Sequence, residues 1–143
     1  MKNKGFTLIE MLVVVAIIGI LSSVLLTALG PAKLKAKDTR IVQEVSQART
    51  IIEGMWDGDY NAVPNIPAQA GEAVPFSLQE LVDDILIQGG ELIIRKTSSD
   101  YVVFSKLNVK IEESGAEKTN YICMDNTGRA RFTTIEPVGV VCL

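Results

Sequence analysis

The sequence predicts an α+β protein in which a long N-terminal helix, half membrane-spanning and half amphipathic, packs on a small antiparallel β-sheet of about four strands. Three observations predict this fold. The chain of 143 residues opens with an uncharged apolar run over residues 11–29. An apolar stripe of helical period follows this run. The C-terminal half then alternates short apolar segments with turn residues, as strands and their connections do.

The apolar run at residues 11–29 holds twelve Leu, Ile and Val residues. It is about as long as a helix must be to cross a bilayer, and these side chains together favour the membrane by roughly 4–7 kcal/mol. Glu10 lies at the edge of the run, where a carboxylate costs less than at the helix centre and where the helix macrodipole favours it. We therefore predict a membrane helix over residues 6–30.

Two cleaved signals compete for the same residues. A secretory signal has a basic start, a short apolar core and a small-x-small cleavage site. Lys2 and Lys4 supply such a start, and residues 28–30 supply such a site. Against this alternative, the apolar core is too long, Glu10 stands at its head and a proline follows the cut. A lipoprotein signal would need a cysteine near the end of the core, whereas the first cysteine is Cys123.

The hexapeptide at residues 5–10, between the basic start and the apolar run, reads Gly-Phe-Thr-Leu-Ile-Glu. It closely resembles the class III signal of type IV pilins and the related pseudopilins. The resemblance implies the type IV pilin fold, a leader peptide over residues 1–5, cleavage between Gly5 and Phe6 by a prepilin peptidase, and N-methylation of Phe6. It also implies that Glu10 is the family's key assembly residue.

Glu10 needs a partner, because an unpaired charge that leaves water costs several kcal/mol. We expect this partner to be the α-amino group of Phe6 in a neighbouring subunit, which would draw an incoming subunit into register. The simpler alternative is that Glu10 only reaches the lipid headgroups. An ionisable group at the membrane edge nonetheless marks a functional position by default.

The second half of the long helix is predicted to be amphipathic and to cover residues 31–58. Gly30 and Pro31 interrupt the helix pattern, and a kink is expected there because proline removes one backbone hydrogen bond and crowds the preceding turn. Gly19 is a second weak point. The helix is expected to resume at Leu34 and end near Trp56, with the tryptophan buried there rather than free to bind a ligand. One apolar stripe should pack on the head: Leu34, Ile41, Val45, Ala48, Ile52 and Met55.

Residues 59–143 are predicted to form a globular α/β head. The glycines and prolines of residues 57–75 predict a loop. Residues Ser77 to Glu80 have the pattern of a capping box, and they open a short helix that ends near Gln88, before two glycines. Four strands are expected in an antiparallel meander whose apolar face receives the helix stripe: residues 92–96, 101–111, 119–124 and 129–135.

Two acidic clusters are candidates for metal binding or for acid–base catalysis. Residues 57–61 have the opening spacing of a calcium loop, but alanine replaces both the glycine and the glutamate that this loop needs, at Ala62 and Ala68. Asp83 and Asp84 could be paired acid–base carboxylates, but a solvated face is the simpler interpretation because no base or nucleophile is near. Histidine is absent from the sequence, which removes the commonest general base. We predict no enzyme, no cofactor and no metal site.

The two cysteines, Cys123 and Cys142, are either a disulfide or two unrelated thiols. A bridge would close a loop of about twenty residues and contribute roughly 3 kcal/mol. Because disulfides persist outside the cytosol, such a bridge would also place the head on the extracytoplasmic side of the membrane. Positive-inside counting does not decide the orientation, since the basic residues at 33–40 rival Lys2 and Lys4. The layout resembles the C-terminal disulfide loop of pilins.

The resemblance implies a structural subunit that polymerises through its N-terminal helix into a type IV pilus-like filament. The partners it implies are other copies of the chain, other pilins, a prepilin peptidase, membrane lipid and an inner-membrane assembly platform with a motor ATPase. The subunit would be a single-pass membrane protein with an extracytoplasmic head before assembly, and part of an extracellular filament afterwards. The alternatives are a pseudopilin of a type II secretion or DNA-uptake system, and a membrane-anchored binding domain that never polymerises. The net charge of −3 offers nucleic acid no broad basic field.

Overall fold

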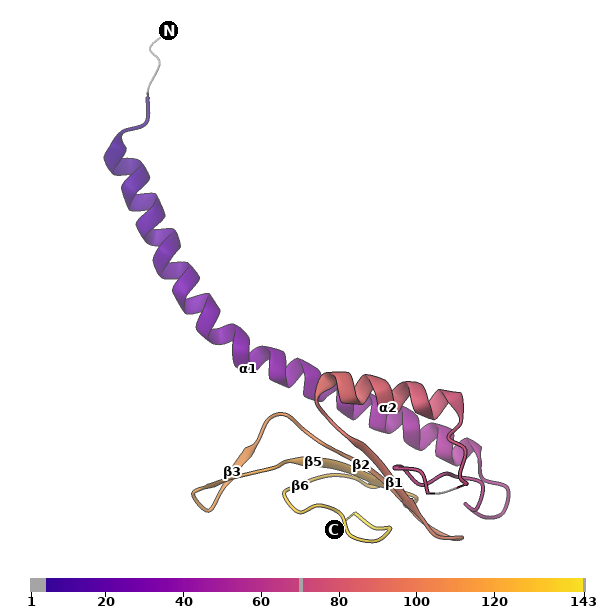
Figure 1. Cartoon of the computed structure of the whole chain (residues 1–143). Helices are drawn as coiled ribbons and strands as arrows, with labels where there is room; N and C mark the ends of the chain where they lie inside the picture. The colour runs from indigo at the N-terminus through magenta and orange to yellow at the C-terminus, as the bar shows by residue number, and fades with distance from the viewer. Residues whose placement is uncertain (1–4, 70, 143) are drawn as a thin grey trace. The chain divides into compact units, whose positions relative to one another are not determined.

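The computed structural model describes residues 5–69 and 71–142. Residues Met1 to Lys4, which form most of the predicted leader, lie outside this described part. The chain divides into two compact units, Met1–Lys33 and Leu34–Leu143. Helix α1 (Leu8–Gly54) contributes its first part to the first unit and the rest to the second (Figure 1).

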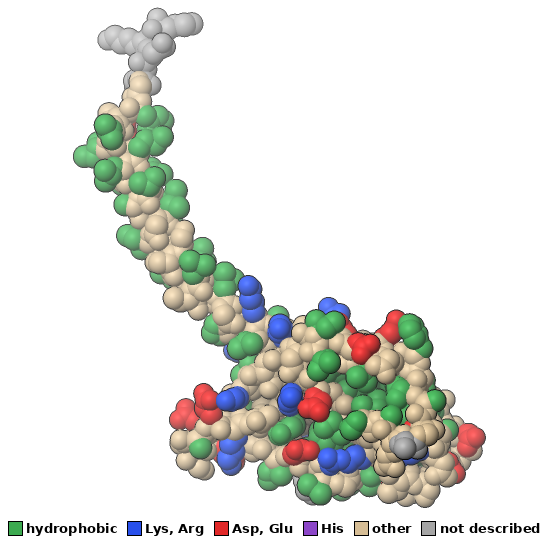
Figure 2. All heavy atoms as spheres, in the orientation of Figure 1, with side chains coloured by type: hydrophobic (Ala, Val, Ile, Leu, Met, Phe, Trp, Pro, Cys, Tyr) green, Lys and Arg blue, Asp and Glu red, His purple; other side chains and the backbone are tan. Residues whose placement is uncertain are grey.

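The first unit consists of the apolar part of α1. Its Leu, Ile and Val side chains are all exposed, and apolar side chains project from it along its visible length (Figure 2). Ser23 and Thr27 donate their hydroxyl hydrogens to backbone carbonyls of the same helix, at Ile20 (2.8 Å) and Val24 (2.9 Å). These two hydroxyl groups are therefore satisfied within the helix, as polar groups in lipid must be. Among the described residues, α1 is the one helix long and apolar enough to span a bilayer.

Helix α1 runs without a gap from Leu8 to Gly54 with Pro31 inside it, so it does not stop at Gly30 and Pro31 and resume at Leu34 as predicted. Proline removes only one hydrogen bond of the ladder. The residues around it, such as Leu29 and Ala32, are strong helix formers, so the helix continues through the weak position. Gly19 also lies inside the continuous helix.

The second unit contains one further helix and two small sheets (Figure 1). Strands β1, β2, β5 and β6 form a four-stranded antiparallel sheet in that order, and β3 and β4 form a separate hairpin. The predicted four-stranded antiparallel meander is thus confirmed, with the hairpin inserted between its second and third strands. The elements are α2 (Phe76–Gln88), β1 (Leu92–Lys96), β2 (Tyr101–Lys106), β3 (Ile111–Glu113), β4 (Ala116–Lys118), β5 (Tyr121–Asp125) and β6 (Ala130–Thr133).

The apolar stripe of α1 forms the centre of the head's core. Its middle positions, Ile41, Val45, Ala48 and Ile52, are fully buried in one cluster with residues of α2 and the sheet. The two ends of the stripe differ: Leu34, at the boundary between the units, is exposed, whereas Met55 is partly buried against this cluster. The predicted burial of Trp56 is wrong, because this residue follows the end of the helix at Gly54. Trp56 keeps 47% of its surface exposed and packs on Tyr60, with ring centroids 4.4 Å apart.

Strand β2 is buried on both faces, as its continuous apolar start predicts. Tyr101 and Val103 belong to the cluster that packs on α1. Val102 and Phe104 point to the other face and pack with the two cysteines. The sheet therefore separates a large core under the helices from a small one under the C-terminal segment.

The start of α2 corrects a second prediction. The helix begins at Phe76 with Pro75 as its N-cap, and no side chain caps it. Backbone N–H groups of Leu78 and Gln79 donate to the Pro75 carbonyl, both at 3.0 Å. Ser77 consequently lies inside the first turn, where it cannot act as the N-cap of a capping box. The end is as predicted: Gly89 adopts φ 94°, and its N–H group and that of Gly90 donate back to the last turn.

The strand predicted over residues 101–111 stops at Lys106 because an aspartate of α1 takes over its hydrogen bonds. The Asp38 carboxylate accepts hydrogen bonds from the backbone N–H groups of Asn108 (2.7 Å) and Val109 (2.9 Å), and from the Asn108 side-chain amide (2.8 Å). These contacts tie α1 to the segment after β2 and turn the chain toward the β3–β4 hairpin.

Asp38→Ala is expected to lower the free energy of unfolding by about 2–3 kcal/mol, because it leaves part-buried backbone N–H groups without an acceptor. The measurement is urea unfolding of the full chain in detergent micelles, followed by the fluorescence of Trp56, the single tryptophan. Thr39→Ala is the matched control, since the Thr39 hydroxyl donates only within α1, to the Lys35 carbonyl. Equal midpoints for the two variants would contradict this role of Asp38.

Candidate functional site

The start of α1 is fixed by a reciprocal pair of hydrogen bonds between Thr7 and Glu10. The Thr7 backbone N–H and hydroxyl both donate to Glu10 Oε2, at 2.8 and 2.7 Å. The Glu10 backbone N–H donates to the Thr7 hydroxyl oxygen at 3.3 Å. Thr7 therefore acts as the N-cap and Glu10 as the third helical residue of a capping box.

Sequence reasoning missed this capping box, although its signal was present. Threonine, two residues and glutamate directly before a long apolar run is the expected pattern. The prediction placed a capping box only at Ser77–Glu80, where the structure does not form it. Glu10 thus has a local structural role in addition to any role between subunits.

The bond between Gly5 and Phe6 lies outside the helix, which begins at Leu8. Phe6 is 77% exposed, and an added Cβ at Gly5 would meet nothing within 4 Å. A peptide bond in a non-helical, open segment can enter an enzyme's active site without local unfolding. The predicted cleavage position therefore has the accessibility that proteolysis needs.

Among residues 5–69 and 71–142, no ion pair involves Glu10. Glu10 is the sole charged residue between Gly5 and Ala32. It borders an open apolar hollow that Phe6, Ile9, Val13 and Val14 also line. In the hydrogen bonds found for the described residues, Oε2 accepts both bonds from Thr7 and Oε1 accepts none. One carboxylate oxygen is therefore available to an ammonium group that approaches from another molecule.

The two cysteines form a disulfide between β5 and the C-terminal segment, Cys123–Cys142, across a sequence separation of 19. Both sulfurs lie in the small core beneath the sheet, with Val102 and Phe104. The guanidinium of Arg95 lies over the Phe104 ring, 5.2 Å from its centroid. The bridge thus holds the C-terminal segment on the face of the sheet opposite α1.

The acidic clusters of the head make contacts within the fold. Asp59 accepts hydrogen bonds from the backbone and side chain of Asn61. Asp83 accepts one from Gln79, whereas Asp84 pairs with Arg40 of α1. The neighbouring carboxylates of Asp83 and Asp84 thus have separate partners and do not form an acid–base pair.

The fold and the site together define a class: a subunit with a capped apolar N-terminal helix, an open peptide bond before it, and a disulfide-stabilised α+β head. A family model described as "Prokaryotic N-terminal methylation motif" matches residues 1–26. This match covers the candidate cleavage position, Glu10 and most of the apolar run.

Part of the chain is similar to fimbrial proteins, among them type IV fimbrial proteins. The chain is 37% identical over 71 residues to fimbrial protein EcpB of Eikenella corrodens, and this aligned region covers 49% of the chain and 43% of the relative. It is 44% identical over 51 residues to the type IV major fimbrial protein FimA of Dichelobacter nodosus (36% and 33%). A fimbrial protein of Pseudomonas aeruginosa is 46% identical over the same length (36% and 33%).

The chain spans less than half the length of the curated relatives that it matches. No solved structure was found to match it. The methylation motif and the fimbrial relatives support a type IV pilin.

Proposed function

We propose that this chain is a structural subunit of a type IV pilus, a pilin without enzymatic activity. The observation that carries the proposal is a methylation motif over residues 1–26 that includes the capped start of α1, where the Leu, Ile and Val side chains of residues 8–29 are all exposed. A helix with this surface needs lipid or other helices around it. A pilin has both, first as a membrane protein and then within a filament.

Assembly would transfer the apolar helix from lipid into a bundle of identical helices. Lipid tails are as apolar as leucine, so burial alone provides little driving force, and packing and polar contacts must give the specificity. The carboxylate of Glu10 is suited to pair with the amino group of Phe6 in a neighbouring copy. When a head-to-tail contact of this kind repeats from subunit to subunit without closing into a ring, it produces a filament.

The remaining parts of the proposal concern processing and location. A prepilin peptidase would remove residues 1–5 and methylate Phe6, and an assembly platform with a motor ATPase would extract the subunit from the membrane. The disulfide supports an extracytoplasmic head, because such bonds persist in oxidising compartments. It also favours a pilin over a secretion pseudopilin.

Gly5→Val tests the processing step. We expect the variant to keep its leader and to be absent from filaments sheared off the cell surface, because the peptidase site would no longer contain glycine. The measurement is the gel mobility of the membrane-bound chain together with an immunoblot of the sheared fraction. Gly30→Ala is the control, since it changes a glycine inside α1 that a Cβ would not crowd. A Gly5→Val chain that is cut and assembled normally would contradict the proposal.

A further inference from the structure

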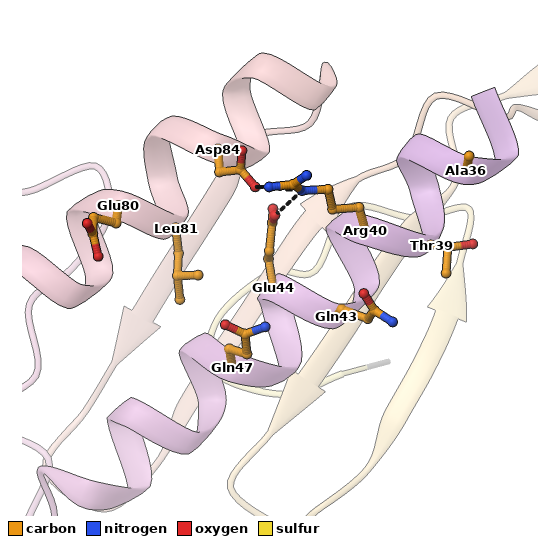
Figure 3. A pocket seen from close by; sticks show the side chains of 9 residues that line it. All are labelled: Ala36, Thr39, Arg40, Gln43, Glu44, Gln47, Glu80, Leu81 and Asp84. Carbon is orange, nitrogen blue, oxygen red and sulfur yellow. Dashed lines mark hydrogen bonds and ion pairs between the residues drawn. The ribbon is translucent and has the colours of Figure 1, made fainter. Parts of the chain in front are cut away.

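A groove between α1 and α2 contains a cluster of three charged side chains, which we call the Arg40–Glu44–Asp84 cluster (Figure 3). Arg40 and Glu44 come from successive turns of α1, and Asp84 comes from α2. Figure 3 shows the guanidinium between the two carboxylates, which both point toward it. The cluster thus joins the short helix to the long one.

The guanidinium does not serve the two carboxylates equally. Arg40 Nε and Nη2 both donate to Asp84 Oδ2, at 2.7 and 2.6 Å. Glu44 Oε1 accepts a hydrogen bond from Arg40 only through the same Nε, at 2.9 Å. Nε carries a single hydrogen, so Glu44 shares with Asp84 the one hydrogen bond that it accepts from Arg40.

Glu44 is also the most buried member of the cluster. Its side chain is 6% exposed, against 29% for Asp84 and 57% for Arg40. Its second oxygen, Oε2, is shielded from solvent and has no hydrogen-bond partner. A charged carboxylate in this position would have a buried oxygen without a donor, which is costly.

A proton on Glu44 removes this cost. It neutralises the buried group and leaves one carboxylate for one guanidinium. It also makes Glu44 a hydrogen-bond donor, for which the Asp84 carboxylate is an acceptor. In agreement, burial raises the pKa of Glu44 to about 7, and the hydrogen bond to Asp84 acts in the same direction. The hydrogen bonds from Glu44 and Arg40 lower the pKa of Asp84.

We infer that Glu44 and Asp84 share one proton next to the Arg40 guanidinium. This proton stabilises the contact between α2 and α1, and its loss weakens that contact. The charged groups that act on Glu44 are Arg40, one turn before it in α1, and Asp84 in α2. Glu80 of α2 lines the same groove. When the proton leaves, two adjacent carboxylates compete for one guanidinium, and their repulsion loosens α2.

The direction of the pH effect follows from the raised pKa of Glu44. The folded head holds this proton at pH values where the unfolded chain has released it, so the proton stabilises the fold most at low pH. This stabilisation is lost as the pH rises through about 7. The loss should concentrate in α2, because the cluster attaches that helix.

The experiment is amide hydrogen exchange of the α2 peptide in the full chain in detergent micelles, from about pH 4, below the pKa of an ordinary glutamate, to about pH 8.5. Wild type and Glu44→Gln are compared at each pH, so that the base catalysis of exchange cancels. The glutamine side chain of this variant resembles the protonated carboxyl and donates to Asp84 at every pH. We expect the α2 amides of wild type to match those of the variant at low pH and to exchange at least about tenfold faster at high pH.

Glu80→Gln is the matched control, since it removes a carboxylate from the same groove without touching the cluster, and it should keep the wild-type pH profile. A second readout is the ¹³C shift of the Glu44 side-chain carboxyl, which should titrate near neutral pH in wild type and at lower pH in Asp84→Asn. Titration of wild-type Glu44 below about pH 5, close to an ordinary glutamate, would overturn the inference. So would equal exchange of wild type and Glu44→Gln at every pH.

Discussion

Glu10→Ala is expected to remove the chain from surface filaments, with at least about a hundredfold loss of sheared subunit, while its amount in the membrane stays the same. The apolar run alone drives insertion, so the carboxylate is not needed for that step. It is needed in the assembled state, where the amino group of a neighbouring Phe6 would otherwise lie unpaired in an apolar bundle. The measurement is an immunoblot of the membrane and sheared fractions from the same cells.

The capping box requires two further variants, because alanine also removes a hydrogen-bond acceptor from the helix start. Glu10→Gln keeps a capping oxygen but has no charge, and it should assemble as poorly as alanine. Thr7→Ala removes the N-cap, worth about 1 kcal/mol, but leaves the charge, and it should still form filaments. If Glu10→Gln assembled normally and Thr7→Ala did not, the role of Glu10 would be to cap the helix, and the pairing with Phe6 would be wrong.

Removal of the disulfide is the second change with a large expected effect. Replacing Cys123 and Cys142 together by serine should lower the free energy of unfolding of the head by about 3 kcal/mol. The bridge closes a sequence separation of 19, and a loop of this size costs the unfolded chain about this much entropy. The loss should appear in urea unfolding of the full chain in detergent micelles, followed by Trp56 fluorescence.

Wild type measured with and without a reductant is the control, because both cysteines are then retained in the small core. The reduced wild type should unfold close to the double variant. If reduction left the unfolding midpoint unchanged, the bridge would not stabilise the head, and the C-terminal segment would be held by its packing on Val102 and Phe104 alone.

Much of the fold could be predicted from the sequence, because periodicity reports which side of an element is buried. The stripe that includes Ile41, Val45 and Ile52 has helical spacing, and these residues form the core. The run of apolar residues at the start of β2, Tyr101 to Phe104, likewise agrees with burial of this strand on both faces. The strand's end at Lys106 could not be predicted, because it depends on Asp38, which lies about seventy positions away and binds backbone groups that no pattern in the strand reveals.

The local errors at helix positions have a related origin. Pro31 breaks a rule of helix propensity, but strong helix formers surround it, and α1 continues. Ser77 has the residue type and spacing of a cap, but Pro75 starts the helix earlier. In both cases neighbouring residues outweighed the residue that the prediction used.

For the candidate site, the motif predicts roles for Gly5, Phe6 and Glu10, and these stay predictions. The structure adds the contact between Glu10 and Thr7 that fixes the helix start. The Arg40–Glu44–Asp84 cluster could not be predicted from the sequence. Its members come from two helices, and only the packing of α2 on α1 brings Asp84 to Arg40.

The central claim, that this chain is processed and assembled as a pilin, is tested most directly by the intact mass of the subunit in sheared surface filaments, with and without reduction. We predict a chain that lacks residues 1–5, carries one methyl group on Phe6, and gains two hydrogens when the bridge between Cys123 and Cys142 is reduced. A filament fraction without the chain, or a chain that keeps its leader in the membrane and never leaves it, would contradict the claim.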